Sequence, residues 1–365
     1  MSNKMKQYTD YINNIKGNIL LGCDGFVDET YQLVEVRKSP TEFTPMEKLK
    51  DFGELLVERA DGGVGVEIVP KRRCEGGFAI NSGRVAASLG LKPKLPGLYG
   101  SKTLDPAYEE FKDNCELWSL GDPALTIALE FGDGKVLMSN VEAVSNLAWD
   151  DFEQHFGKEG LEKLFSDVDI LGLGYWSLTA NFDDLFKGFM AQYENIEPPR
   201  RMFFDFADIK KKSRESFTTT LDLIKTYSDK IPMTLSMNEH EGSEFFSRIG
   251  VECPEKTPEM IAPALTKACE KTGFDELVVH TPDFAVASSA TEGEACAMQE
   301  HQTHVVRLAG AGDSFNGGYM CASLGALPIK ERLVVANAAT AFFVTHAKGP
   351  TKEELIARIE KASDK

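Results

Sequence analysis

The chain has 365 residues, of which 42% are hydrophobic and 27% charged, which is enough apolar material for one large domain or two moderate ones. Its formal net charge is −17 at pH 7, with acidic residues spread along the chain. Such a surface repels nucleic-acid backbones and anionic lipids, so we expect neither nucleic acid nor a membrane as a partner. A local group of backbone amides can still bind an anionic nucleotide.

The N-terminal residues and the cysteines bear on the compartment. The polar start "MSNKMKQYTDYINN" lacks the apolar core of a secretory signal, and no apolar run approaches membrane-spanning length. The seven cysteines are an odd number, widely scattered and without a Cys-x-x-Cys pair, which is typical of reduced thiols. We therefore expect a soluble, cytoplasmic protein.

Along the first part of the chain, short apolar runs alternate with amphipathic stretches. Two β-rich runs around Gly132-Asp133-Gly134 predict a hairpin over 125–140. The other elements predicted before residue 100 are strands at 18–23 and 65–70 and helices at 46–60 and 81–90.

After the hairpin, apolar strand candidates recur with helical stretches between most of them. They lie at 169–174, 201–206, 233–238, 276–280, 285–289 and 303–308. This alternation predicts an α/β fold with a doubly wound, largely parallel sheet. The early strands and the hairpin do not fit the rhythm, and we expect them to form a small β appendage.

The segment "RLAGAGDSFNGGYM", residues 307–320, is rich in glycine around one aspartate. We expect a turn at Gly310-Ala311-Gly312 and a helix from Asp313, in which Gly317 and Gly318 allow close packing. The N-terminus of a helix carries unpaired amides and the positive end of the dipole, which attract anions. Glycines let this backbone approach a phosphate.

Two familiar phosphate loops do not fit this segment. The dinucleotide fingerprint requires glycine or alanine where Phe315 stands. A Walker A loop requires Gly-Lys-Ser/Thr, but the two Gly-Lys pairs of the chain are followed by Val136 and Glu159. The residues alone leave two interpretations, an anion-binding nest that contains Asp313 or an aspartate that merely caps a helix.

Several motifs in order resemble the PfkB/ribokinase-like carbohydrate kinase family. "GAGDSFNGGYM" is similar to the family's late signature, and "CEGGFAINSG" matches its early Gly-Gly-x-x-x-Asn signature at Gly76, Gly77 and Asn81. "NEHE" matches an Asn-x-x-Glu motif at Asn238 and Glu241. The resemblance spans roughly residues 17–355.

Two weaker matches complete the resemblance. In "LGCDGFVDETY", Asp28 is the best match to an aspartate that holds substrate hydroxyls. In "ANAATAFFVTHAKGPT", Asn337 belongs to a late helix that borders the nucleotide.

The resemblance implies a ribokinase-like α/β fold, in which a doubly wound, mostly parallel sheet is flanked by helices and carries a small β lid. We accordingly expect an N-terminal extension at 1–16 and a kinase domain at 17–365. The lid would come from about 28–75 and 120–142, and two copies would pair through it as a homodimer.

The same resemblance implies transfer of the ATP γ-phosphate to a hydroxymethyl group of a sugar or sugar derivative, with Mg²⁺ and frequently a monovalent cation. Asp313 would be the base, and the amides of Gly310, Ala311 and Gly312 would form the anion hole. Because the hydroxyl loses its proton late, a weak base suffices, and we expect Asp313 to stay ionised at the helix N-terminus.

Roles for the remaining residues follow from the resemblance, each with a structural alternative. Asp28, Gly76, Gly77 and Asn81 would bind the substrate, although Asp28 and Asn81 are also suited to capping a turn and a helix. Asn238 and Glu241 would organise the nucleotide and Mg²⁺, Glu241 through water. They also suit a capping pair, and Asn337 suits a packed helix position as well as an adenine contact. For each of these side chains the sequence is compatible with both the binding role and the capping or packing role.

The chain departs from the family pattern just before the glycines. The family has Asp-Thr there, whereas this chain has Arg307, Leu308 and Ala309, which leaves dependence on a monovalent cation open. A nucleoside kinase of the same superfamily, ADP as the donor, and a non-catalytic sugar- or nucleotide-binding relative are the alternative functions.

Overall fold

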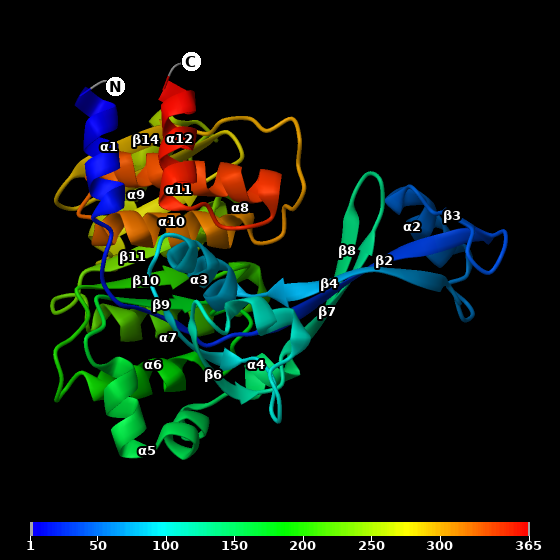
Figure 1. Ribbon diagram of the computed structural model, residues 1–365, viewed down its shortest axis with the longest axis horizontal. Coiled ribbons are helices and arrows are strands. Elements are labelled where there is room, and N and C mark those ends of the chain that lie inside the picture. The colour runs from blue at the N-terminus through cyan, green and yellow to red at the C-terminus, as the bar shows by residue number, and fades with distance from the viewer. Residues whose placement is uncertain (1–2, 364–365) are drawn as a thin grey trace.

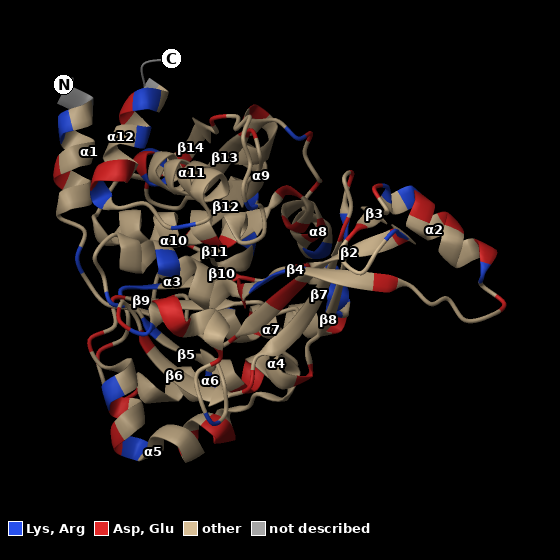
Figure 2. Ribbon diagram, turned by 45° about the vertical axis from the view of Figure 1, so that its right-hand side comes forward, with Lys and Arg blue, Asp and Glu red and all other residues tan. Residues whose placement is uncertain are grey.

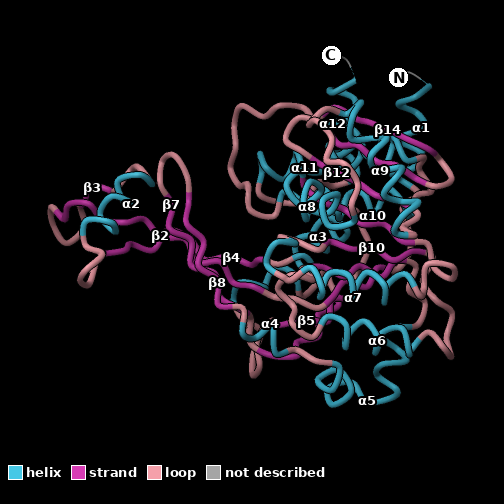
Figure 3. Tube along the Cα trace, turned by 180° about the vertical axis from the view of Figure 1, so that it is seen from behind, coloured by secondary structure: helices cyan, strands magenta, loops and turns pink. Residues whose placement is uncertain are grey.

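A nine-stranded sheet runs through the body of the molecule, helices cover both of its faces, and a second, smaller sheet projects from one side (Figures 1 and 3). The structure is a computed structural model, in which residues 3–363 are described. In this part of the chain no helix is long and apolar enough to cross a membrane.

The central sheet has the order β14-β13-β12-β11-β10-β9-β1-β5-β6. Its strands are β1 (Ile19–Gly22), β5 (Lys94–Leu98), β6 (Glu116–Gly121), β9 (Ile170–Gly174), β10 (Arg201–Asp205), β11 (Met233–Asn238), β12 (Glu276–His280), β13 (Phe284–Ser289) and β14 (Gly293–Met298). All neighbours are parallel except β12–β13 and β13–β14. The predicted mostly parallel, doubly wound sheet is therefore confirmed.

Helices lie on both faces of this sheet. One face carries α1 (Asn3–Asn13), α3 (Phe78–Ser88), α10 (Ala311–Leu324), α11 (Ile329–His346) and α12 (Lys352–Ser363). The other carries α5 (Trp149–Phe165), α6 (Phe182–Gln192), α7 (Arg214–Lys225), α8 (Glu239–Ile249) and α9 (Pro258–Thr272). Short helical segments are α4 (Glu142–Asn146), η1 (Pro106–Phe111) and η2 (Ile209–Lys211).

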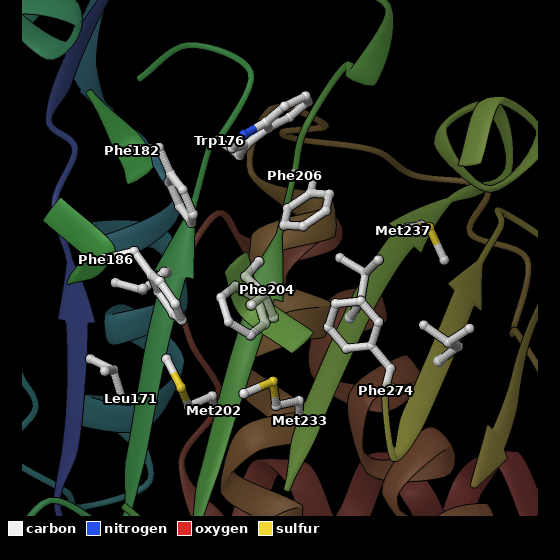
Figure 4. Packing of buried hydrophobic residues seen from close by; sticks show 14 of the residues in the cluster. Leu171, Trp176, Phe182, Phe186, Met202, Phe204, Phe206, Met233, Met237 and Phe274 are labelled. Atoms are coloured by element: carbon white, nitrogen blue, oxygen red, sulfur yellow. The ribbon is translucent and has the colours of Figure 1, made fainter. Parts of the chain in front are cut away.

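Alternation along the strands sends side chains into two hydrophobic cores. On β10, Met202 and Phe204 point into the core on the side of α5–α9, and Phe203 between them points into the other core. Figure 4 shows Phe204 beside Phe186 and Phe206 in the first of these cores. A strand buried on both faces explains the continuous apolar runs in the sequence.

Residues 1–16, expected as an extension, contain helix α1. Its Tyr8 and Ile12 are buried in the same core as Leu355 and Ile359 of α12, and the two helices lie side by side in Figure 1. The described part of this segment therefore packs onto the body of the molecule.

The projecting sheet is built from two separate stretches of the chain. Its strands are β2 (Phe26–Arg37), β3 (Phe43–Pro45), β4 (Glu67–Gly76), β7 (Ala124–Glu130) and β8 (Lys135–Asn140). β2 pairs with β7 in parallel and with β3 and β4 antiparallel, and β7–β8 is the predicted hairpin. We call this sheet the lid, and the predicted small β appendage is confirmed by it.

The lid also carries a helix, α2 (Leu49–Glu58), between β3 and β4. Phe52 of α2 packs with Leu33, Leu129 and Phe131 of the lid, which gives the outer part of the lid a small core of its own. In the view of Figure 2, acidic and basic residues are interspersed along α2 and α5, as on solvated helix faces.

The strand predicted at 303–308 is wrong, because residues 299–310 form a loop without strand or helix. The N–H groups of Val306 and Arg307 both donate to the carbonyl of Val344 at the end of α11, rather than to a neighbouring strand. The Arg307 side chain turns into the protein, whereas Val305, Val306 and Leu308 are exposed, so the apolar residues of this segment are not the buried face of a strand.

Close helix packing fixes the position of α10. A Cβ atom on Gly317 would lie 2.5 Å from the carbonyl oxygen of Ser82 in α3, so only glycine permits this approach. At the next position, Gly318 faces Ala336 and Ala339 of α11. The glycines therefore serve the predicted close packing, which holds the N-terminus of α10 against α3.

Candidate active site

Asp313 lies in the first turn of α10 and is buried, with 5% of its surface exposed. Two side chains donate hydrogen bonds to its carboxylate: Asn81 Nδ2 at 3.1 Å and the Tyr175 hydroxyl at 3.2 Å. The Ser82 hydroxyl donates to the backbone carbonyl of Asp313 at 3.0 Å. Residues of α3 and of the segment after β9 therefore fix the orientation of this carboxylate.

The surroundings of Asp313 oppose the expectation that it stays ionised as a weak base. Burial raises its pKa well above the usual range, and the carboxylates of Asp205 and Asp24 raise it further. The hydrogen bonds from Asn81 and Tyr175 act in the opposite direction. The helix dipole favours the ionised form, but burial and carboxylates from distant parts of the chain favour the protonated form.

A cavity of about 630 Å³ lies between the lid and the body. It brings together six of the predicted site residues: Asp28, Gly76, Gly77, Asn81, Gly310 and Asp313. Its wall thus combines lid strands, the start of α3 and the loop before α10. A cavity of this size, with carboxylates and apolar groups in its wall, can enclose a small polar molecule.

Asp28 lies on β2 of the lid directly against Gly76 of β4, whose Cβ position would be 2.9 Å from Asp28 Oδ2. Burial raises the pKa of Asp28, and the Arg307 guanidinium counteracts this shift. Asn81 lies in the first turns of α3. Its Nδ2 bonds Asp313, whereas its buried Oδ1 has no hydrogen-bond partner within residues 3–363.

The predicted anion hole is only partly free. The Ala311 amide donates to the carbonyl of Leu308 at 3.0 Å, which closes the turn before α10. Within the described residues, the amides of Gly310 and Gly312 have no such protein acceptor. Beside Gly312 lies His280, whose pKa burial lowers to about 4, so a neutral imidazole forms this wall.

Asn238 and Glu241 form a capping box at the start of α8. Asn238 Oδ1 accepts from the Glu241 amide at 3.0 Å, and Glu241 Oε2 accepts from the Asn238 amide at 2.9 Å. The structural alternative for this pair is therefore realised. Burial raises the pKa of Glu241, and the nearby Asp205 carboxylate raises it further.

The predicted nucleotide-side residues do not line the cavity that holds Asp313. Asn337 is buried in α11, and its Nδ2 donates to the carbonyls of Ala297 and Met298 on β14 at 3.1 and 3.2 Å. Its amide nitrogen thus ties α11 to the edge of the sheet. Among residues 3–363, no three His, Cys, Asp or Glu side chains are grouped so that they could hold a metal ion.

Sequence reasoning missed two residues next to the site. Tyr175 follows β9, has a φ of 56° and donates a hydrogen bond to Asp313. Its position directly after a predicted strand is the sequence signal that could have identified it, because ligands bind at the carboxyl ends of such strands. Asp24 accepts from the amides of Phe78 and Ala79 at 2.6 and 3.0 Å and so caps α3. Nothing in the local sequence distinguished Asp24 from Asp28.

The sheet, the lid and a buried aspartate at the start of α10 together define a ribokinase-like carbohydrate kinase. Solved structures agree with this fold. The nucleoside kinase of Methanocaldococcus jannaschii, an archaeal member of the ribokinase family, has a TM-score of 0.62 and 15% identity, covering 95% of this chain and 99% of its own. A putative ribokinase II from E. coli, in complex with ATP and Mg²⁺, has a TM-score of 0.63 and 15% identity, covering 95% and 99%.

The family model of prokaryotic ketohexokinase matches residues 7–361, and the chain belongs to this family. The ketohexokinase of Haloferax volcanii is 27% identical over 349 residues, which cover 93% of this chain and 90% of that protein. The chain is an ATP-dependent sugar kinase, and the resemblance seen in its motifs is confirmed.

Proposed function

We propose that this protein transfers the γ-phosphate of ATP to a hydroxymethyl group of a ketohexose, with Asp313 as the base. The observation that carries the proposal is the convergence of Asp28, Asn81 and Asp313 on one cavity. The matched family supplies the class of sugar, and a cavity of about 630 Å³ has room for a hexose together with the transferring phosphate.

The chemistry assigned to these residues follows from their surroundings. Asp28 and Asn81 offer acceptors and a donor to sugar hydroxyls, which orients one hydroxymethyl group toward Asp313. The raised pKa of Asp313 makes its carboxylate a stronger base, while hydrogen bonds from Asn81 and Tyr175 favour the ionised form. The N-terminus of α10 and the free amides of Gly310 and Gly312 would stabilise charge on the transferring phosphoryl group.

The carboxylates of Glu241 and Asp205 suit Mg²⁺ held through water and not by a full set of protein ligands. One Glu241 oxygen accepts a hydrogen bond from the Asn238 amide. The negative charges of Glu241 and Asp205 repel each other, and a divalent cation between them would relieve this repulsion. Because no three-ligand cluster exists within the described chain, Glu241 would hold the ion through water. When bound with ATP, Mg²⁺ neutralises phosphate charge. Asn337 would contact adenine through its oxygen, since its nitrogen is bonded to β14.

A monovalent cation does not fit the segment before the glycines. The buried guanidinium of Arg307 lies there, and its Nε already donates to the carbonyl of Ala309 at 3.0 Å. A second cation at these carbonyls would meet like charge. We therefore infer that phosphoryl transfer does not depend on potassium.

Two copies of the chain would pair through the lid. Support comes from apolar side chains that remain exposed on it, among them Val36 at 52%, Ile68 at 40% and Met138 at 47%. Apolar groups that stay exposed on a projecting sheet are suited to an interface. A small-molecule sugar and a second copy are thus the proposed partners.

The test is turnover of ATP with a panel of ketohexoses, aldoses, pentoses and nucleosides, with and without KCl. We expect a ketohexose to give the highest kcat/KM and KCl to leave it unchanged. Asp313→Asn should lower kcat by about 10²–10⁴-fold because a positioned base contributes that much. Asp51→Asn, which alters an exposed first-turn aspartate of α2, should retain full activity.

Other outcomes separate the alternatives. Preference for a nucleoside would identify a nucleoside kinase, and turnover with ADP in place of ATP would reassign the donor. Ligand binding without any phosphoryl transfer in the unaltered protein would support a binding protein. Full activity of Asp313→Asn would disprove the assignment of the base.

A further inference from the structure

The Arg307 side chain joins the loop before α10 to the end of lid strand β4. Its Nη1 donates to Glu75 Oε1 at 2.6 Å, its Nη2 to the Glu75 carbonyl at 2.8 Å, and its Nε to the Ala309 carbonyl at 3.0 Å. Arg307 and Glu75 are 6% and 5% exposed. Pairing and several hydrogen bonds are what a buried guanidinium requires.

Each end of this bridge is one residue from the site. Glu75 directly precedes Gly76 and Gly77, which both line the cavity, and Ala309 directly precedes Gly310. Arg307 itself lines the cavity, and its charge also acts on the Asp28 carboxylate. The Arg307 side chain therefore contacts Glu75, next to the lid residues proposed to bind the sugar. It also contacts Ala309, next to the amides proposed to bind the phosphate.

The bridge is braced on both sides. Arg84 of α3 contacts the same Glu75 Oε1 through its Nη2, and its Nη1 donates to Glu110 at 2.7 Å. On the other side, the Arg307 guanidinium carbon lies 5.5 Å from the centre of the Phe343 ring in α11. Glu75 is thereby fixed to α3, and Arg307 is fixed to α11.

The loop has few other anchors. Residues 299–310 contain no strand or helix, and near the site their backbone is tied to α11 through the Val306 and Arg307 amides, which share the Val344 carbonyl. The guanidinium therefore links Ala309 to lid strand β4, in addition to the α3–α10 packing that holds Gly310. A displacement of about 1 Å between reacting groups can cost on the order of 100-fold in rate.

We propose that Arg307 is a positioning residue, which holds the amides before α10 at a fixed distance from the substrate edge of the lid by bridging Ala309 and Glu75. This inference rests on the proposed function for its kinetic consequence but not for its structural one. Lysine cannot replace arginine here, because a single ammonium cannot reach the Glu75 side chain, the Glu75 carbonyl and the Ala309 carbonyl in the same planar geometry.

The kinetic test compares Arg307→Lys, Arg307→Met and Glu75→Gln with the unaltered protein. We expect Arg307→Lys to lower kcat by about 10–100-fold while sugar KM changes less than about threefold, because its charge near Asp28 remains. Arg307→Met should lower kcat similarly and also raise sugar KM. The matched control is Arg37→Met, which removes a solvent-exposed Arg37–Glu67 pair that also links β2 to β4, and it should leave both constants unchanged.

A measurement without substrate keeps the inference separate from the proposed function. Hydrogen exchange of the Val306 backbone amide, which donates to the Val344 carbonyl at 2.7 Å, measures how firmly the loop is held against α11. Because residue 306 is the same in every variant, this amide can be compared across all of them. We expect it to exchange faster in Arg307→Lys and Arg307→Met than in the unaltered protein and in Arg37→Met.

The outcomes are decisive in both directions. Unchanged exchange at Val306 together with kcat within threefold of the unaltered value in Arg307→Lys would overturn the proposal. If Arg307→Met does not fold, Glu75→Gln, which is isosteric and keeps the Glu75 carbonyl, should still show an intermediate loss of kcat. Absence of sugar turnover by the unaltered protein would disprove the proposed function, whereas the exchange result would still test the bridge.

Discussion

At the scale of single residues, the site depends on how one carboxylate is surrounded. Asp313 is buried near Asp205 and Asp24, which raises its pKa, and it accepts hydrogen bonds from Asn81 and Tyr175, which lower it. Burial also raises the pKa of Tyr175 well above its usual range, so this hydroxyl stays protonated and acts as a donor. The proposed base is therefore tuned by side chains from α3 and from the segment after β9.

Tyr175→Phe should move the acid limb of the pH profile of kcat to higher pH. Asp313 accepts a proton only when ionised, so activity falls as the pH drops below its folded-state pKa. Loss of the Tyr175 hydrogen bond at 3.2 Å removes an interaction that lowers this pKa. The profile should be measured between about pH 5 and 9, the range over which tuned carboxylates act as bases.

Tyr193→Phe is the control for this prediction. Tyr193 is half-buried like Tyr175, but its buried hydroxyl makes no hydrogen bond within residues 3–363. Its removal should leave the acid limb in place. An unshifted profile in Tyr175→Phe would show that the hydroxyl does not tune Asp313.

At the scale of elements, the start of α3 is built around Asp24 and Gly77. Gly77 has φ 111° and ψ 156°, a conformation that is essentially restricted to glycine, and it precedes the first helical residue Phe78. A Cβ atom on Gly77 would lie 2.7 Å from Asp24 Oδ2. This turn lets the Asp24 carboxylate cap the helix that carries Asn81.

Gly77→Ala should lower the free energy of unfolding by about 3 kcal/mol, because it combines a strained backbone with a clash against the buried cap. Gly90→Ala also has a positive φ, of 84°, but its Cβ would meet nothing within 4 Å, so we expect a loss of about 1 kcal/mol. Urea denaturation of both variants tests this difference. Equal losses would mean that the contact with Asp24 does not matter for stability.

At the scale of the whole molecule, the lid projects from the body (Figure 1). Several of its apolar side chains are exposed. The small core around Phe52 accounts for the folding of its outer part, but Ile68 and Met138 stay exposed. Burial of such groups against a second copy would be favourable by roughly 25 cal/mol for each Å² of apolar surface. One face of the lid lines the cavity, and the proposed pairing would cover exposed apolar groups such as Ile68 and Met138.

If two copies pair through the lid as proposed, Ile68→Glu should convert the dimer into a monomer, because a charge in an apolar interface is costly to bury. Light scattering after size exclusion should give about twice the chain mass of 40.3 kDa for the unaltered protein and the single mass for the variant. Met260→Glu, at an exposed apolar position of α9 on the body, should remain dimeric. A monomeric unaltered protein would disprove pairing through the lid.

The sequence by itself determined the parts that local patterns specify. Apolar runs predicted the central strands from β9 to β13, because strands buried on both faces need continuous apolar residues. The glycine turn predicted the β7–β8 hairpin, and the spacing of short motifs predicted the family. Asp313 stood out because a carboxylate among glycines at a helix start is a pattern within a few residues.

Tertiary structure decided what depends on contacts between distant segments. Asn81 and Asp313 are 232 positions apart, and so are Glu75 and Arg307, so no local pattern could reveal either pair. The pKa of Asp313 follows from burial and from carboxylates on other elements. The segment 303–308 has the composition of a strand, but its valines and Leu308 are exposed and its backbone bonds α11 instead of a neighbouring strand. Burial and electrostatics are properties of the folded arrangement, and they set the chemistry of this site.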